Sequence, residues 1–244
     1  MTDPTRDLPA PARALAIGAH PDDIEFGAGA TLARWAQAGT DIHLLVLTDG
    51  AKGTWDRGED LGALIARREE EARAAATTLG NGTVHFLRLV DGELESGAAE
   101  REQVCRVIRS VRPDVLLGHD PWKRYRLHPD HRHAGWLTVD GVVAARDPHF
   151  FPGAGEHHRP ERLLLFEADE PNHFEDVGAT LGVKVDALLC HRSQWRSTMG
   201  IEAGSADEDA QRQAFVQRIE ERAARAGEPV GLAVAEAFHR IDDL

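Results

Sequence analysis

The stretch Ala14-Leu15-Ala16-Ile17-Gly18-Ala19 is followed directly by His20-Pro21-Asp22-Asp23. The first part is short and apolar, which is typical of a buried β-strand. The second part places an imidazole and two carboxylates on the loop that leaves this strand, and Pro21 stiffens the turn. Because ligands bind at the carboxyl ends of the strands in open α/β sheets, this loop is a candidate ligand site. The simpler interpretation is a solvated acidic turn with an incidental histidine, and this stretch alone does not separate the two.

A second stretch, His128-Pro129-Asp130-His131, repeats the same residue types after another apolar run at residues 115–118. One His-x-x-His pair carries little weight, because the chain has 13 histidines. Two His-Pro-Asp loops, each after a predicted strand, favour a metal site between them, to which His20 and Asp23 could contribute. Two histidines and one carboxylate suit zinc with an open position for water. The same ligands could hold iron, manganese or cobalt, so the pattern predicts a divalent transition metal and favours zinc among several.

These motifs resemble the signatures of the PIG-L/LmbE-like zinc deacetylases, whose members remove acetyl groups from N-acetylglucosamine units. The resemblance is carried by Ala19-His20-Pro21-Asp22-Asp23, by Gly27-Ala28-Gly29-Ala30-Thr31 and by His128-Pro129-Asp130-His131. It covers most of the chain and includes Arg68, Glu71 and residues 184–194. It implies a Rossmann-like sheet with helices on both faces and a zinc-dependent N-deacetylase.

The resemblance assigns the metal ligands to His20, Asp23 and His131, and the general base to Asp22. An amide is a poor electrophile, and zinc supplies a strong nucleophile by lowering the pKa of bound water toward ~7. Asp22 neighbours the ligands without being needed as one, so it can take the proton of the attacking water. His128 precedes His131 by three residues, and the resemblance gives it the stabilisation of the oxyanion or the protonation of the amine.

Four further residues complete the predicted site. Asp130 could accept a hydrogen bond from an imidazole and hold its tautomer, or it could cap the helix that starts beside it. Arg68 interrupts the apolar stripe of a helix expected over residues 61–79, so it either forms a buried ion pair or points toward the pocket. Asp91 ends a predicted strand at the same sheet edge and is expected, with Arg68, to bind the sugar ring. Tyr125, the only tyrosine, is assigned to substrate binding because family members often carry a tyrosine shortly before the second motif.

Three other histidines receive no catalytic role. His43 and His85 lie within predicted strands and are expected as core or edge residues. His191 lies in a stretch that resembles the same family, and its role stays open.

The composition limits the partners and the compartment. The chain has 244 residues and a net charge of −13, which disfavours nucleic acid because phosphate binding needs a basic surface. No apolar run approaches the roughly 18 residues of a membrane span. Cys105 and Cys190 are interpreted as buried free thiols, which suits a cytoplasmic protein. Residues 1–11 are polar and carry prolines, so a loose arm is expected there instead of a signal peptide. The oligomeric state is open, a homo-oligomer included.

Strand and helix patterns alternate along the chain, and the strands are apolar runs without polar alternation. This pattern predicts an α/β fold with a doubly wound, mostly parallel sheet, in a single domain over residues 1–244. Strands are expected at 14–19, 41–48, 84–87, 115–118 and 163–167. Helices are expected at 31–38, 61–79, 102–111, 131–145, 183–194, 206–226 and 232–240.

Two alternatives compete with the enzyme. The first is a dinucleotide-binding oxidoreductase, because Gly27-Ala28-Gly29 lies between a strand and a helix and Asp49 follows. Leu32 stands at the third glycine position, however, and residues 20–26 separate the strand from the first glycine, where a tight turn is needed. The second is a non-catalytic or regulatory metal-binding protein of the same fold, which the retention of Asp22 and His128 disfavours. The motifs predict a metal-dependent hydrolase, and the resemblance implies that it acts on a small molecule or glycoconjugate bearing N-acetylglucosamine.

Overall fold

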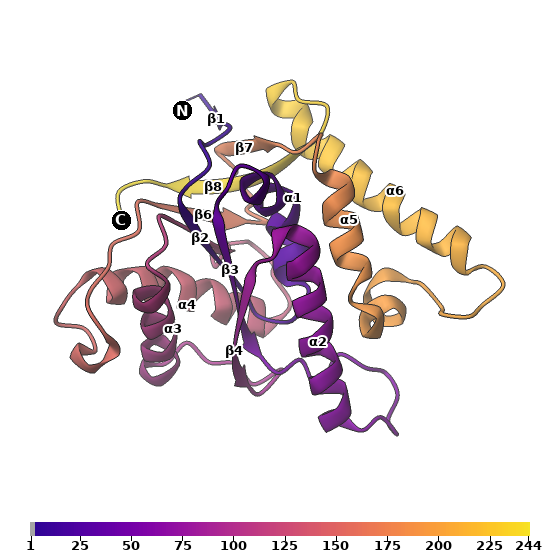
Figure 1. The fold of residues 1–244 in the computed structure, drawn as a ribbon, viewed down its shortest axis with the longest axis horizontal. Coiled ribbons are helices and arrows are strands. Elements are labelled where there is room, and N and C mark those ends of the chain that lie inside the picture. The colour runs from indigo at the N-terminus through magenta and orange to yellow at the C-terminus, as the bar shows by residue number, and fades with distance from the viewer. Residues whose placement is uncertain (1–2) are drawn as a thin grey trace.

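The computed structural model describes residues 3–244, which form one eight-stranded sheet with helices on both faces (Figure 1). The strand order is β1-β7-β8-β6-β5-β2-β3-β4. The strands are β1 Thr5–Arg6, β2 Arg13–Gly18, β3 Asp41–Thr48, β4 Thr83–Leu89, β5 Val115–His119, β6 Arg162–Phe166, β7 His173–Asp176 and β8 Ala235–Ile241. The α-helices are α1 Asp23–Gln37, α2 Leu61–Gly80, α3 Ala98–Val111, α4 Pro129–Arg146, α5 Leu181–Leu189 and α6 Glu208–Gly227.

Five consecutive strands, from β6 to the edge strand β4, run parallel. β2 pairs with β3 and β5, β4 extends the sheet beyond β3, and β6 extends it beyond β5. β8 runs antiparallel to both β6 and β7, and β1 pairs in parallel with β7. The mostly parallel sheet predicted from the sequence is confirmed. Its carboxyl edge collects the loops that follow β2, β5 and β6.

Each face of the sheet has its own apolar core. Leu15 and Ile17 of β2 pack with α3 and α4, whereas Ala14 and Ala16 of the same strand pack with α1, α2 and α5. Figure 1 shows α3 and α4 on one side of the strands and α1, α2 and α5 on the other, with α6 outside α5. A third cluster around Phe215 joins α5 to α6. Burial on both faces explains why the strands read as continuous apolar runs.

The first helix begins earlier than predicted. We expected helix from residue 31, but α1 starts at Asp23, so Gly27 and Gly29 lie inside it. A Cβ on Gly27 would lie 2.6 Å from the Phe166 ring, and one on Gly29 would lie 3.3 Å from the Lys184 side chain. Close packing of α1 against β6 and α5 therefore accounts for these glycines. They do not form a phosphate-binding turn, which removes the main support for the dinucleotide alternative.

The C-terminal segment is a strand, and the prediction of a helix over residues 232–240 is wrong. The sequence Ala235–Ile241 contains two alanines and several charged residues that also suit a helix. It pairs instead between β6 and β7, where it satisfies backbone groups that two neighbouring strands leave open. The helix expected over 183–194 also ends sooner, at Leu189, and is followed by a 3₁₀ turn over Arg192–Gln194.

The N-terminal arm is partly ordered, which corrects the expectation of a loose segment over residues 1–11. Met1 and Thr2 lie outside the described residues. Thr5–Arg6 forms β1, and Leu8 is buried in the core on the α1 side. Among the helices of residues 3–244, none combines the length and low polarity that crossing a membrane requires.

Candidate metal centre and active site

Side chains from both predicted motifs meet at the carboxyl edge of the sheet. A cavity of about 570 Å³ opens there between the ends of β2 and β6, the loops after β3 and β4, and the start of α4. Its walls include most of the residues predicted for the site, namely His20, Asp22, Asp23, Arg68, Asp91, His128 and His131. The two distant motifs therefore share one pocket, as their positions after parallel strands predicted.

The turn between β2 and α1 sends two adjacent aspartates in different directions. Asp22 has a φ of 117°, a backbone conformation that costs a non-glycine residue about 1–3 kcal/mol and clusters at functional sites. Asp23 is the first residue of α1, and its Oδ2 accepts a hydrogen bond from the His20 backbone N–H at 2.8 Å. Asp22 lies beside Arg68. One carboxylate is thus held next to the histidines, and the other is set apart from them.

The ligand atoms of His20, Asp23 and His131 lie within 4.8 Å of one another. His20 Nδ1 is 3.3 Å from Asp23 Oδ2, and His131 Nε2 is 3.2 Å from Asp23 Oδ1. Two imidazoles and one carboxylate fit a divalent transition metal. Two other groups meet the same distance criterion: His20 with His128 and Asp130, and His119 with His131 and Glu167.

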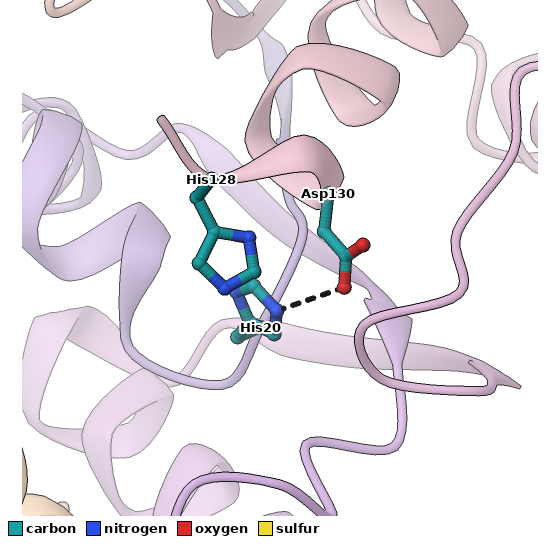
Figure 2. A group of neighbouring side chains, drawn as sticks. All are labelled: His20, His128 and Asp130. Carbon is teal, nitrogen blue, oxygen red and sulfur yellow. Dashed lines mark hydrogen bonds and ion pairs between the residues drawn. The ribbon is translucent and has the colours of Figure 1, made fainter. Parts of the chain in front are cut away.

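The group of His20, His128 and Asp130 is better explained as support for a ligand (Figure 2). Asp130 is fully buried and accepts a hydrogen bond from the Gly92 backbone N–H at 2.6 Å. Its Oδ2 also lies 3.2 Å from His20 Nε2, the contact drawn in Figure 2. Metal-binding histidines usually donate their second N–H to a carboxylate in this way. With Asp130 at Nε2, the Nδ1 atom of His20 faces Asp23. The role of Asp130 as a tautomer holder stays a prediction.

The group of His119, His131 and Glu167 already surrounds a cation. Arg126 Nη1 lies 3.1 Å from His119 Nδ1, 3.3 Å from His131 Nδ1 and 2.7 Å from Glu167 Oε2. A guanidinium in this position opposes a second positive charge at the same place. The set of His20, Asp23 and His131 remains as the candidate metal centre.

The two aspartates differ in protonation as well as in direction. Burial raises the pKa of Asp22 to about 6, although Arg68 opposes the rise. Burial also disfavours the charge on Asp23, but the imidazoles of His131 and His119 outweigh it and hold the pKa of Asp23 well below its usual range. Environments that push two neighbouring carboxyl groups apart in this way are typical of one acid–base residue beside one permanently ionised residue.

Burial and neighbouring charges also shift the pKa values of two histidines in the pocket. Burial opposes a charge on His20, but the carboxylates of Asp130, Asp23 and Asp91 outweigh it and raise the pKa of His20 well above its usual value. An environment that favours a proton on His20 equally favours a bound cation. Burial and the neighbouring imidazoles of His20 and His131 lower the pKa of His128, which therefore stands in the pocket as a neutral ring.

Arg68 and Asp91 hold the loops around the pocket and also line it. The guanidinium of Arg68 donates to the backbone oxygens of Gly50 at 2.8 Å and Pro21 at 2.7 Å, and Nη2 lies 3.7 Å from Asp22 Oδ1. Asp91 Oδ2 accepts from the Lys52 backbone N–H at 2.8 Å, and Oδ1 lies 3.2 Å from His20 Nε2. The two interpretations of Arg68, ion pair and pocket wall, both describe part of its environment.

Tyr125 is not brought to this pocket. Its side chain is 87% exposed and lines a separate cavity beside Trp122, on the outer side of the loop between β5 and α4. The next residue, Arg126, is the one that turns inward and lies beside His131. The backbone of Tyr125 has a φ of 59°, so the chain reverses locally and presents neighbouring residues to opposite sides.

Several residues at the site were not predicted. His119 is the last residue of β5, and Glu167 directly follows β6, so both stand at carboxyl ends of strands like the residues that were found. Their position at the ends of predicted strands was the sequence feature that could have identified them. His191, whose role was left open, is fully buried with Nε2 3.4 Å from Glu25 Oε1. Gln194 donates to the backbone oxygen of Gly53 at 3.1 Å and so ties the 3₁₀ turn after α5 to the loop after β3.

Residues 15–142 match the profile of the PIG-L family, described as GlcNAc-PI de-N-acetylase. The chain belongs to the PIG-L family. The predicted resemblance is thereby confirmed, and the matched region contains both His-Pro-Asp motifs.

PIG-L relatives of known name include two deacetylases. The chain is 38% identical to the diacetylchitobiose deacetylase of Thermococcus kodakarensis, over 80% of this chain and 73% of the relative. It is 35% identical to the 1D-myo-inositol 2-acetamido-2-deoxy-alpha-D-glucopyranoside deacetylase of Kineococcus radiotolerans, over 57% of this chain but only 46% of that relative. The solved structure of N,N'-diacetylchitobiose deacetylase from Pyrococcus horikoshii superposes with a TM-score of 0.83 at 27% identity, covering 95% of this chain and 84% of that one.

Proposed function

We propose that this PIG-L member is a metal-dependent hydrolase that removes the acetyl group from an N-acetylglucosamine-type substrate. The observation that carries the proposal is the meeting of His20, Asp23 and His131 with the separate carboxylate of Asp22 in one pocket. The similarity to a named diacetylchitobiose deacetylase supports the same reaction class. Two unpaired cysteines, Cys105 and Cys190, support a location in the cytoplasm.

We assign His20, Asp23 and His131 as ligands of one divalent ion, zinc by preference. When bound, such an ion acts as a Lewis acid on the acetyl oxygen and lowers the pKa of water toward ~7. Asp130 holds the tautomer of His20 and so directs its Nδ1 toward the ion.

Asp22 is assigned as the general base. Its pKa of about 6 is close to the pH at which a base both exists in its ionised form and accepts a proton effectively. Arg68 lies on the other side of this carboxylate and keeps part of the charge stabilised. Asp22 takes the proton of the attacking water while Asp23 stays ionised as a ligand.

We assign His128 to the stabilisation of the tetrahedral oxyanion by a hydrogen bond. It precedes α4 and lines the pocket beside His20, with ring centroids 4.7 Å apart. A neutral imidazole can still donate one N–H to a developing negative charge. The proton that Asp22 gains from water is then available for the departing amine.

We assign sugar binding to Arg68 and Asp91, which both line the pocket. Trp55 lies at the rim of the same cavity with its side chain mostly exposed, and it offers an apolar face to a sugar ring. A buried carboxylate and a guanidinium give strong, directional hydrogen bonds to hydroxyl groups.

The test is release of a primary amine from a panel of acetylated sugars. Zinc-reconstituted protein is incubated with N-acetylglucosamine, diacetylchitobiose and an inositol-linked N-acetylglucosamine, and amine is measured with fluorescamine. The matched control is Asp22→Asn, which leaves the proposed ligands in place. Amine release by the wild type but not by this variant supports the proposal. A fully metallated wild type that releases no amine from any of the three favours the non-catalytic alternative.

A further inference from the structure

His119 occupies a position behind the proposed metal ligands that the catalytic assignment does not use. It is the last residue of β5, and only 1% of it is exposed. Its Nε2 is buried without a hydrogen bond and lies 3.3 Å from Asp23 Oδ2. Its Nδ1 lies 3.1 Å from Arg126 Nη1 and 3.5 Å from Glu167 Oε2. One nitrogen of a buried ring is thus aimed at a carboxylate that is proposed to bind metal.

The neighbours of Nδ1 decide which nitrogen carries hydrogen. The guanidinium of Arg126 only donates, so Nδ1 of a neutral His119 accepts and the hydrogen resides on Nε2. An imidazolium also carries a hydrogen on Nε2, with its Nδ1–H toward Glu167. The remaining tautomer would set an N–H against the guanidinium and a lone pair against Asp23. In both favoured forms His119 therefore presents an N–H to Asp23 Oδ2.

Asp23 is held from two sides by this arrangement. Oδ2 accepts from the His20 backbone N–H at 2.8 Å and faces His119, whereas Oδ1 lies 3.2 Å from His131 Nε2. The His119 ring also stacks on His131, with centroids 4.5 Å apart and an interplanar angle of 16°. The same ring therefore contacts one proposed ligand at its edge and another at its face.

The backbone that carries His119 packs closely against α4. A Cβ on Gly118 would lie 2.6 Å from Thr138 Oγ1, and a Cβ on Gly135 would lie 2.9 Å from the His119 backbone oxygen. Thr138 and Gly135 both belong to α4, the helix that carries His131. Glycine at these two positions allows the end of β5 to pack directly against α4. The strand end and the helix are consequently fixed relative to each other.

We propose that His119 is a positioning residue of the metal centre. It orients the Asp23 carboxylate so that Oδ1 faces His131, and the Arg126–Glu167 ion pair keeps the His119 hydrogen on Nε2. His119 would serve Asp23 as Asp130 serves His20, by fixing a ligand through a contact outside the metal's own shell. The inference rests on the proposed metal ligands His20, Asp23 and His131.

The test compares amide and apolar replacements of one ring. The amide nitrogen of His119→Gln reaches the place of Nε2, whereas that of His119→Asn reaches only the place of Nδ1, and His119→Leu has no donor. The metal-depleted full chain is titrated with zinc alone in competition with a chromogenic chelator. We expect the Asn and Leu variants to bind zinc about 10- to 100-fold more weakly, and the Gln variant to recover most of the affinity. His43→Gln, a histidine replacement near the amino end of β3, should match the wild type.

Three outcomes would overturn the proposal. Wild-type affinity in the Asn and Leu variants would remove His119 from the metal centre. Equal losses in the Gln and Asn variants would mean that the ring only fills space, and thermal unfolding of the metal-free proteins would show the matching loss of stability. A wild-type chain that binds no zinc would overturn the ligand assignment and this role together, so failure of the metal site is distinguishable from failure of the positioning role.

Discussion

At the carboxyl edge of the sheet His20 and His131 both face the carboxylate of Asp23, whereas near the amino ends of β3 and β4 His43 faces His85. His43 Nδ1 lies 3.0 Å from His85 Nε2, and the two rings are nearly parallel. His43 also lies 3.3 Å from the half-exposed carboxylate of Asp41, which Arg13 already pairs at 3.0 Å. Both places combine two histidines with an aspartate, yet their surroundings differ.

The difference lies in where the nitrogen lone pairs point. At the carboxyl edge Asp130 binds Nε2 of His20, which leaves Nδ1 directed at the space beside Asp23. In the pair of His43 and His85, the two rings form a hydrogen bond with each other, in which one ring nitrogen donates and the other accepts. The pKa values differ in the same way. The carboxylates around His20 raise its pKa well above the usual value, whereas burial and the neighbouring His43 lower the pKa of His85. Outer carboxylates that turn histidines toward a shared space distinguish a metal site from a histidine pair.

The largest effect is expected from removing the base. Asp22→Asn should reduce kcat/KM by about 10²- to 10⁴-fold while the bound metal is retained, because we assign this carboxylate to proton transfer and not to the metal. Amine release and metal analysis on the same sample check this. Asp23→Asn, its neighbour, should instead lose metal, and reversed behaviour of the two variants would exchange their roles.

The next effect concerns the metal and compares the two histidine groups directly. His131→Ala should lose most of the bound zinc with the fold preserved, because one of three proposed ligands is gone. His43→Ala should keep its zinc, since its partner is another histidine. Metal content and far-UV circular dichroism measure both properties. Equal zinc content in the two variants would erase the distinction between the two groups.

A smaller effect is expected at Arg68, which touches both the loops and the base. Arg68→Ala leaves two buried backbone oxygens without their donor, so a loss of about 1–3 kcal/mol in stability is expected. Because Arg68 lowers the pKa of Asp22, its removal should also shift the acidic limb of the kcat/KM profile to higher pH. Arg68→Lys retains the charge and serves as the control. A lower melting temperature with an unshifted pH profile would leave Arg68 a purely structural residue.

The smallest effect tests a third arrangement, one buried histidine with one carboxylate. His173 Nε2 lies 2.9 Å from Glu175 Oε1, and Thr5 lies 2.8 Å from Nδ1. Burial lowers the pKa of His173 to about 4, with positive charge from Arg240 and Arg34 adding to the effect. The ring is neutral in the fold, and Arg34 already balances Glu175.

The sign of the resulting pH dependence follows from proton uptake. Between the unfolded pKa of about 6.5 and the folded pKa of about 4, the unfolded chain binds more protons, so stability should fall as the pH falls through this window. His173→Gln should make the urea midpoint less dependent on pH between 7 and 5. An unchanged dependence would show that other groups control the acid lability.

The sequence predicted the parallel strands from β2 to β6 because buried strands leave a direct pattern in the chain. It also predicted that His20, Asp23 and His131 would meet, since the carboxyl ends of parallel strands share one edge. It did not predict His119 and Glu167, which stand at equivalent strand ends outside the recognised motifs, or Arg126, which lies in the loop between β5 and α4. Their contacts join residues far apart in the chain, and Arg126 turns inward only because the backbone reverses at Tyr125.

What the sequence alone determined is the set of chemical groups: two His-Pro-Asp loops, two adjacent aspartates, and strands apolar enough to be buried on both faces. The tertiary structure decided that residues 235–241 pair as a strand, because the open edges of β6 and β7 outweigh the local preference of an alanine-containing segment. It also decided which nitrogen of each histidine faces the common space. That choice depends on carboxylates and a guanidinium brought in from other elements, and local sequence carries no record of such partners.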